Sequence, residues 1–131
     1  MDNKYELIHS DQMVVDSHTL HRIRALRDFG YVRRGDFGGY IEKDENLSHE
    51  GNCWVYDNAW VFDRAEISGN ARVSGNARVS GNALVSGNAR VYDNAWVSGN
   101  ALVSGNARVY DNAWVSGNAR VSGNALVDGD T

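Results

Sequence analysis

The chain has 131 residues, a length that suits one domain with a small cap better than two full-sized cores. Its net charge of −4 argues against a nucleic-acid-binding domain, which would carry a basic excess, and no apolar run approaches the ~20 residues of a membrane-spanning helix. A single cysteine, Cys53, excludes an internal disulfide framework, and the polar N-terminus does not resemble a secretory signal, so we expect a cytoplasmic protein without a membrane partner.

The first 40 residues lack a regular repeat and are predicted to form a small β cap. Their pattern predicts strands at residues 5–8 and 13–15, joined by a turn at residues 10–12, and a third strand at residues 19–26. The glycine-rich segment 35–39 predicts a tight turn into the next region. We expect two units, a capping segment at 1–40 and a repetitive domain at 41–131, with the first covering one open end of the second.

From Cys53 onward the chain repeats in blocks of six residues of the form Asn-Ala-Arg-Val-Ser-Gly. An aliphatic residue occupies every sixth position from Val55 to Val127, and a small residue lies two positions before each of them. Three residues of each block alternate between inward and outward positions as in a strand. The Ser-Gly-Asn or Tyr-Asp-Asn that follows is a turn, because glycine and asparagine tolerate positive φ. Each block is therefore predicted to be one short strand and one corner.

A longer period of 18 residues is also present. Residues 90–107 and 108–125 differ at a single position. Eighteen residues are three blocks, so we expect three sides per coil and a triangular prism of parallel strands with coils ~4.8 Å apart. Ile41 and Leu47 extend the pattern upstream, with a two-residue insertion at His49-Glu50, which gives about five coils.

The repeat resembles the hexapeptide-repeat left-handed parallel β-helix superfamily, and the run Asn-Ala-x-Val-x-Gly is especially similar to its YdcK-like branch. The resemblance implies an all-β, single-stranded left-handed parallel β-helix; the left hand comes from the resemblance alone. Residues 19–26, 35–42 and 45–48 resemble small phage and prophage proteins that join such a head to such repeats. This second resemblance implies a phage-derived protein in the host cytoplasm that acts on a host factor, including a defence component.

Proteins of this superfamily are often acyltransferases, and the resemblance implies a coil histidine as general base with an acyl-thioester donor between subunits. The four histidines, His9, His18, His21 and His49, all lie outside the regular coils, and His49 in the corner insertion is the one candidate base. His18 and His21 near Asp16 form only a weak metal-ligand pattern. We therefore expect no enzyme, no cofactor and no metal site, with an acyltransferase as the enzymatic alternative.

Outward residues 18 apart are predicted to stack in columns, and all four tryptophans face outward in this scheme. The first side carries arginines flanked by tyrosines: Arg72, Arg90, Arg108, Tyr92 and Tyr110. The second side carries three tryptophans and an arginine: Trp60, Arg78, Trp96 and Trp114. The third side carries charged and leucine residues: Glu66, Leu84, Leu102 and Arg120.

Two interpretations of these columns stay open. In the first, the ladders only stabilise the rod, with Arg78 in cation–π contacts and with Asp93 and Asp111 offsetting the arginines. In the second, the columns are a recognition surface, because exposed aromatic residues and arginine dominate interfaces. Our leading hypothesis is a non-catalytic scaffold that binds a protein partner or forms a homo-oligomer through a flat side or the C-terminal coil. The alternative is a sponge for a small nucleotide-type anion on the arginine and tyrosine columns.

Overall fold

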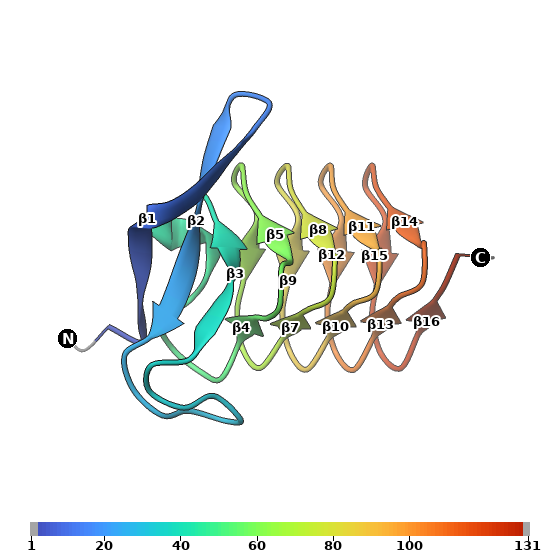
Figure 1. Cartoon of the computed structure of the whole chain (residues 1–131). Coiled ribbons are helices and arrows are strands. Elements are labelled where there is room, and N and C mark those ends of the chain that lie inside the picture. Colours follow the sequence, from blue (N-terminus) through green and yellow to red (C-terminus); the bar gives the residue numbers. More distant parts are fainter. Residues whose placement is uncertain (1–2, 130–131) are drawn as a thin grey trace.

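The computed structural model describes residues 3–129, which form a cap of longer strands followed by a regular stack of coils (Figure 1). In the cap, β1 (Tyr5–Val15) and β2 (His18–Ala25) pair antiparallel, and β3 (Phe37–Ile41) pairs antiparallel with β2. A single 3₁₀ turn, η1 (Asp44–Asn46), follows within the described residues. No helix in this part of the chain is long and apolar enough to cross a membrane.

Two-residue strands then recur at six-residue intervals. Their bounds are β4 (Trp54–Val55), β5 (Trp60–Val61), β6 (Glu66–Ile67), β7 (Arg72–Val73), β8 (Arg78–Val79), β9 (Leu84–Val85), β10 (Arg90–Val91), β11 (Trp96–Val97), β12 (Leu102–Val103), β13 (Arg108–Val109), β14 (Trp114–Val115), β15 (Arg120–Val121) and β16 (Leu126–Val127). The predicted block of one short strand and one corner is thereby confirmed.

These strands pair in parallel with those of the neighbouring coils and form three sheets, the third of which also includes the antiparallel cap strands. This stacking confirms the predicted solenoid of about five coils. One sheet has the order β16-β13-β10-β7-β4, the second β15-β12-β9-β6, and the third runs from the cap into the coils as β1-β2-β3-β5-β8-β11-β14. Arg90 pairs with Arg72 on one side and with Arg108 on the other, so residues 18 apart do lie in columns. The hand of the winding stays the prediction that the resemblance makes.

The core of the prism consists of valine and alanine. These side chains are fully buried from Val55 to Val109, and exposure first appears in the last coil, from Ala113 onward. Because a buried valine contributes ~1.5 kcal/mol, no single coil is stable alone and the stacking of coils carries the stability. Cys53 occupies an alanine position and is buried as predicted, and burial raises the pKa of its thiol.

The corners correct one part of the sequence interpretation. Positive φ falls on glycine and, at Asp57, Asp63, Asp93 and Asp111, on aspartate, whereas the repeat asparagines are absent from the positive-φ residues of the described chain. Six corner asparagines instead donate a side-chain hydrogen bond to the equivalent asparagine one coil on, as Asn88 Nδ2 does to Asn106 Oδ1 at 3.2 Å. Asparagine is therefore selected at this position for an amide ladder between coils.

The first coil is wider, as the insertion at His49-Glu50 predicts. Ile41 pairs with Val61, and Leu47 bridges Ile67, so both partners lie 20 residues apart instead of 18.

The cap differs from prediction in one strand. The expected turn at residues 10–12 is a bulge: β1 continues from Tyr5 to Val15, and its pairing with β2 shifts register between Ile8 and Gln12. A single bulged strand keeps most ladder hydrogen bonds on both sides of the irregularity, which two strands joined by a turn would lose. The reversal of the chain instead comes at Asp16, which has a φ of 54°.

Trp54 faces outward from the prism as predicted, but it is not part of an exposed surface. Its side chain occupies an outer position in register with Arg72 but is only 1 % exposed. The ring of Phe29 packs edge-on against it at 5.2 Å, and the ring of Tyr5 at 6.1 Å. The cap therefore folds over the first side of the prism as well as over its end.

Candidate functional site

The tryptophan face consists of the outer residues of β5, β8, β11 and β14: Trp60, Arg78, Trp96 and Trp114. The guanidinium of Arg78 lies between two indoles, 4.1 Å from the ring centroid of Trp60 and 5.0 Å from that of Trp96, which confirms the predicted cation–π contacts. Trp96 and Trp114 meet edge-to-face at 5.2 Å. Their exposed fractions are 39 % and 68 %, so the face ends in an aromatic pair open to solvent.

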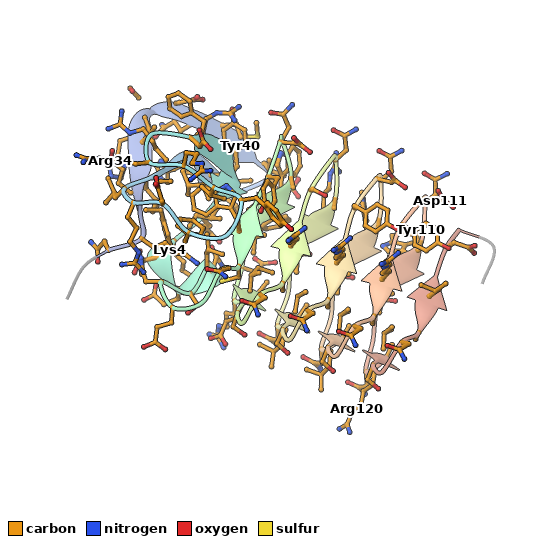
Figure 2. All side chains as sticks on the ribbon, turned by 90° about the horizontal axis from the view of Figure 1, so that it is seen from below. Lys4, Arg34, Tyr40, Tyr110, Asp111 and Arg120 are labelled. Atoms are coloured by element: carbon orange, nitrogen blue, oxygen red, sulfur yellow. The ribbon has the colours of Figure 1, made fainter. Side chains whose placement is uncertain are left out.

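The arginine–tyrosine face lies on the neighbouring side and consists of Arg72, Arg90 and Arg108 with Tyr56, Tyr92 and Tyr110. The rings of Tyr92 and Tyr110 stack at 5.3 Å with an angle of 8° between their planes. Figure 2 shows that outer side chains such as Tyr110 recur in rows along the coils.

The expected offset of the arginines of this face by aspartates does not take the form of direct ion pairs. None of the three takes part in an ion pair within residues 3–129. The carboxylate of Asp93 instead accepts the backbone N–H of Asp111 at 3.1 Å, one coil on. Like charges directly opposite each other destabilise a sheet, so the stacking of Arg72, Arg90 and Arg108 in one column costs electrostatic free energy.

His49, the candidate base, is held in a joint between the cap and the first coil. Its Nδ1 accepts the backbone N–H of Lys4 at 3.0 Å, so its Nε2 carries the proton and donates to Asp44 Oδ1 at 2.8 Å. The ring of Tyr5 stacks on the imidazole at 4.1 Å. Both ring nitrogens are therefore engaged, and His49 has no lone pair directed at a substrate.

Lys4 forms the buried part of the same joint. Its Nζ donates to the carbonyl oxygens of Cys53 at 2.7 Å and Gly51 at 3.3 Å, and lies 4.7 Å from the centroid of the Phe29 ring. Burial lowers the pKa of this ammonium group. The side chain fastens the N-terminal strand to the insertion corner.

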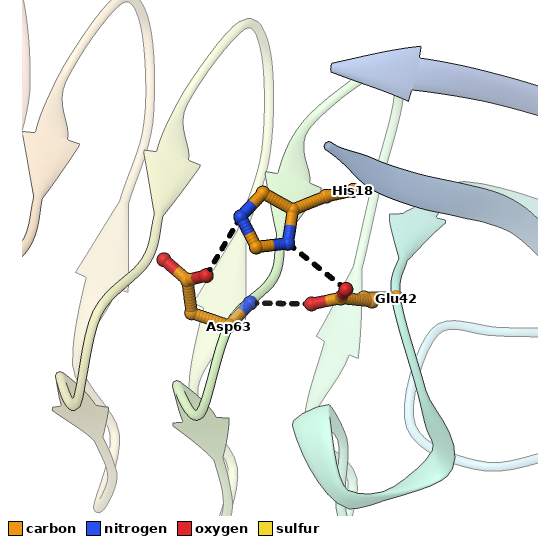
Figure 3. Close-up of side chains that lie close together, drawn as sticks. All are labelled: His18, Glu42 and Asp63. Carbon is orange, nitrogen blue, oxygen red and sulfur yellow. Dashed lines mark hydrogen bonds and ion pairs between the residues drawn. The ribbon is translucent and has the colours of Figure 1, made fainter. Parts of the chain in front are cut away.

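A cluster of three titratable groups joins the cap to two coils (Figure 3). His18 Nδ1 lies 2.9 Å from Glu42 Oε2, and His18 Nε2 lies 3.0 Å from Asp63 Oδ1. The hydrogen bond to Glu42, together with the charges of Asp63, Glu42 and Asp16, raises the pKa of His18 despite partial desolvation. Partial burial opposes ionisation of Glu42, but hydrogen bonds from His18 and the backbone N–H of Asp63 lower its pKa. The cluster is an ion-pair clamp around a protonated imidazole.

The clamp residues are also the group that could hold a metal ion among the described residues, since their ligand atoms lie within 4.8 Å of one another. A metal would need a neutral His18, and its two ring nitrogens point to different carboxylates, so one carboxylate would have to turn away. The weak metal-ligand pattern of His18 and His21 does not come together as one group. The ring of His21 instead packs edge-on against the ring of His9, with 4.8 Å between the ring centroids.

The clamp is expected to make stability depend on pH. The pKa of His18 is raised above 6.5 in the folded state, so the clamp contributes fully below about pH 6.5 and loses its contribution as pH rises through the folded-state pKa. The difference in unfolding free energy between the wild type and His18→Gln should be larger at pH 6 than at pH 9 in urea denaturation. Equal differences at both pH values would contradict a protonated clamp.

Comparison with known proteins shows that part of the regular coils is similar to a known repeat. A family model described as the YdcK β-solenoid repeat matches seven overlapping windows that together cover residues 65–117. Residues 65–117 are therefore similar to the YdcK β-solenoid repeat. A stretch of 38 residues is also 47 % identical to "Uncharacterized acetyltransferase YdcK" of Escherichia coli (strain K12). That stretch covers 29 % of this chain and 12 % of the relative, so the chain matches a small part of a much longer protein.

Most residues of the tryptophan face and of the arginine–tyrosine face lie within residues 65–117. The clamp around His18 and the joint around His49 lie outside this range, and they include residues that the sequence analysis did not single out. Lys4 belongs to no motif, and Glu42 lies in the segment 35–42 that resembles phage proteins but has no role assigned there; the partners of both residues lie far away in the chain. Asp63 did leave a signal, since it stands at a corner position that glycine occupies in most blocks.

Proposed function

We propose that the protein is a non-catalytic β-solenoid scaffold whose tryptophan face docks a protein, with a second copy of this chain as the occupant. The observation that carries the proposal is the edge-to-face pair of Trp96 and Trp114, exposed at one end of a flat parallel sheet. An indole buries 150–250 Å² when covered, so covering the exposed parts of this pair contributes about 2–3 kcal/mol per ring.

The regularity of the coils supports a docking role. Every coil repeats the same ladder of backbone hydrogen bonds, such as Trp96 N–H to the carbonyl of Ala113 at 2.9 Å, which makes the sheet a rigid platform. Rigid aromatic groups lose little conformational entropy on binding, and arginine and tryptophan are enriched among the residues that dominate interface energetics. The resemblance to phage proteins extends the proposal to a host protein, such as a defence component, as a further partner of this face.

The double variant Trp96→Ser/Trp114→Ser tests the docking surface. The wild type should show at least a dimer mass in light scattering at micromolar concentration, and the variant should be monomeric because the covered indoles supply the association energy. Circular dichroism should remain unchanged, since both side chains lie outside the core.

The matched control is Leu84→Ser/Leu102→Ser on the third side. These leucines also occupy outer positions of successive coils, and Leu84 is as exposed as Trp96. The control should keep the mass of the wild type. A monomeric wild type, or a tryptophan variant that stays associated, would overturn docking of a second copy.

Acyl transfer is a second candidate function, favoured by the acetyltransferase name of the similar protein. Under this alternative, the protein should release coenzyme A from acetyl-CoA with an amine acceptor, and His49→Gln should abolish the release. Under the scaffold proposal, the wild type and His49→Gln should both release no more than buffer does, because both nitrogens of His49 are engaged.

A further inference from the structure

The tyrosine column of the arginine–tyrosine face has one missing ring. In four successive coils the position after the core valine is Tyr56, Ser74, Tyr92 and Tyr110. The backbone bonds of this column run from Tyr56 N–H to Val73 and from Ser74 N–H to Val91, which puts Ser74 between Tyr56 and Tyr92. Two phenol rings one coil apart already stack here, at 5.3 Å for Tyr92 and Tyr110.

The missing ring leaves a slot of the right thickness for one planar group. Coils are ~4.8 Å apart, so Tyr56 and Tyr92 are separated by two coil spacings, or about 10 Å. A flat ring placed in the row of Ser74 would lie ~4.8 Å from each phenol, within the ~4.5–7 Å that stacked aromatic rings prefer.

The slot opens into a groove of about 640 Å³. The cap contributes Tyr31, whose ring lies 4.7 Å from the guanidinium carbon of Arg72 and is otherwise largely exposed. The coils contribute Tyr56, Tyr92 and the two arginines Arg72 and Arg90. The groove therefore combines aromatic walls with two guanidinium groups and two carboxylates.

The groove has no net formal charge, because two aspartates line it together with two arginines, but the arginines are placed to bind an anion. Arg72 and Arg90 are paired in register and form no ion pair within residues 3–129. Asp57 and Asp93 also line the groove, but each uses a carboxylate oxygen to accept a backbone N–H of the next coil, from Gly75 at 2.9 Å and from Asp111 at 3.1 Å. An anion between the two guanidiniums would relieve their repulsion without displacing a carboxylate from either arginine.

The charges of Arg72 and Arg90 both act on the pKa of Tyr56. Burial raises the pKa of its phenol, while the charges of Arg72 and Arg90 act in the opposite direction. Both arginines therefore lie within electrostatic reach of the ring that forms one wall of the slot.

We propose that this groove binds a planar aromatic ring that carries an anionic group, the chemistry of a nucleoside monophosphate. The ring stacks in the row of Ser74 between Tyr56 and Tyr92, and the phosphate bridges Arg72 and Arg90. The site lies on a different face from the tryptophan face, so it stands or falls independently of the docking function.

Isothermal titration of the full chain with four probes tests the site. AMP and 1-naphthyl phosphate combine a ring and an anion, whereas adenosine and inorganic phosphate each offer one of the two. We expect saturable binding of AMP or 1-naphthyl phosphate, with at least tenfold weaker binding of adenosine and of phosphate. Arg90→Gln, an exposed position outside the core, should weaken the binding at least tenfold.

Ser74→Tyr fills the slot with a ring from the chain itself. It should abolish binding while leaving the melting temperature unchanged or higher, because the new ring continues the stack. The matched control is Ser86→Tyr, an equivalent half-buried corner position on the third side, which should bind as the wild type does. The proposal is overturned if neither ring-bearing phosphate binds, if phosphate or adenosine alone binds as tightly, or if Ser74→Tyr binds normally.

Discussion

Replacing Val97 with aspartate is expected to unfold the solenoid. Val97 is fully buried in the middle of the stack and pairs with Val79 and Val115 in the neighbouring coils. The buried polar side chains of the described residues are Lys4 and Asn46, both at the cap end, so nothing near Val97 can pair with a carboxylate. An unpaired buried charge costs several kcal/mol, and the lost valine adds ~1.5 kcal/mol. A small protein has only about 5–15 kcal/mol of stability in total.

Urea denaturation followed by circular dichroism measures this effect, and Ser98→Asp is its control. The control places the same charge one residue further on, at a corner position that Asp128 occupies in a later block. It should change the unfolding free energy by less than about 0.5 kcal/mol. A cooperative transition of Val97→Asp at the midpoint of the wild type would contradict the conclusion that the stacked valine–alanine core carries the stability.

Gly99 is expected to accept aspartate but not valine. Its φ is +66°, and a Cβ there would lie 2.8 Å from the backbone nitrogen of Gly117 in the next coil. A β-branched side chain at positive φ costs ~1–3 kcal/mol in strain alone, and its methyl groups would also push the two coils apart. Aspartate occurs at the equivalent corner at Asp63, where its carboxylate accepts the backbone N–H of Gly81 at 3.0 Å.

We therefore expect Gly99→Val to lose at least about 3 kcal/mol of unfolding free energy and Gly99→Asp to lose no more than about 1 kcal/mol. Gly117→Val separates backbone strain from the close approach of the next coil, because Gly117 has a similar φ of +64° but no described atom within 4 Å of its Cβ position. It should fall between the other two variants in urea denaturation. Equal losses for Gly99→Val and Gly99→Asp would show that close approach, and not carboxylate bonding, decides this corner.

Local periodicity explains why so much of the coil region was predictable. A strand as short as Arg90–Val91 is specified by its own block, and each block pairs with an almost identical one 18 residues away. Because the blocks are nearly identical, a wrong assignment of inward and outward positions in one block would be inconsistent with all the others. The contact of Arg78 with two tryptophans was predicted from the 18-residue period, since the register of a parallel sheet determines which residues are cross-strand neighbours.

For the candidate sites, the sequence predicted which residues share a column but not the contacts that those residues make. Sequence placed Arg72 and Arg90 in one column, but their lack of carboxylate partners depends on Asp93 turning its side chain toward the corner backbone. Sequence likewise recorded Ser74 between tyrosines, but the groove also needs Tyr31, which the cap brings to Arg72. No repeat links residue 31 to residue 72.

The sequence by itself determined the all-β solenoid, its three sides and the columns on them, because a repeated local pattern leaves the backbone few alternatives. Only the tertiary structure decided how the cap meets the coils: the burial of Trp54, the locking of His49 and the clamp of His18 with Glu42 and Asp63. These contacts join segments that are far apart in the chain and share no period, so their geometry exists only once the first coil gives the cap a surface to pack on.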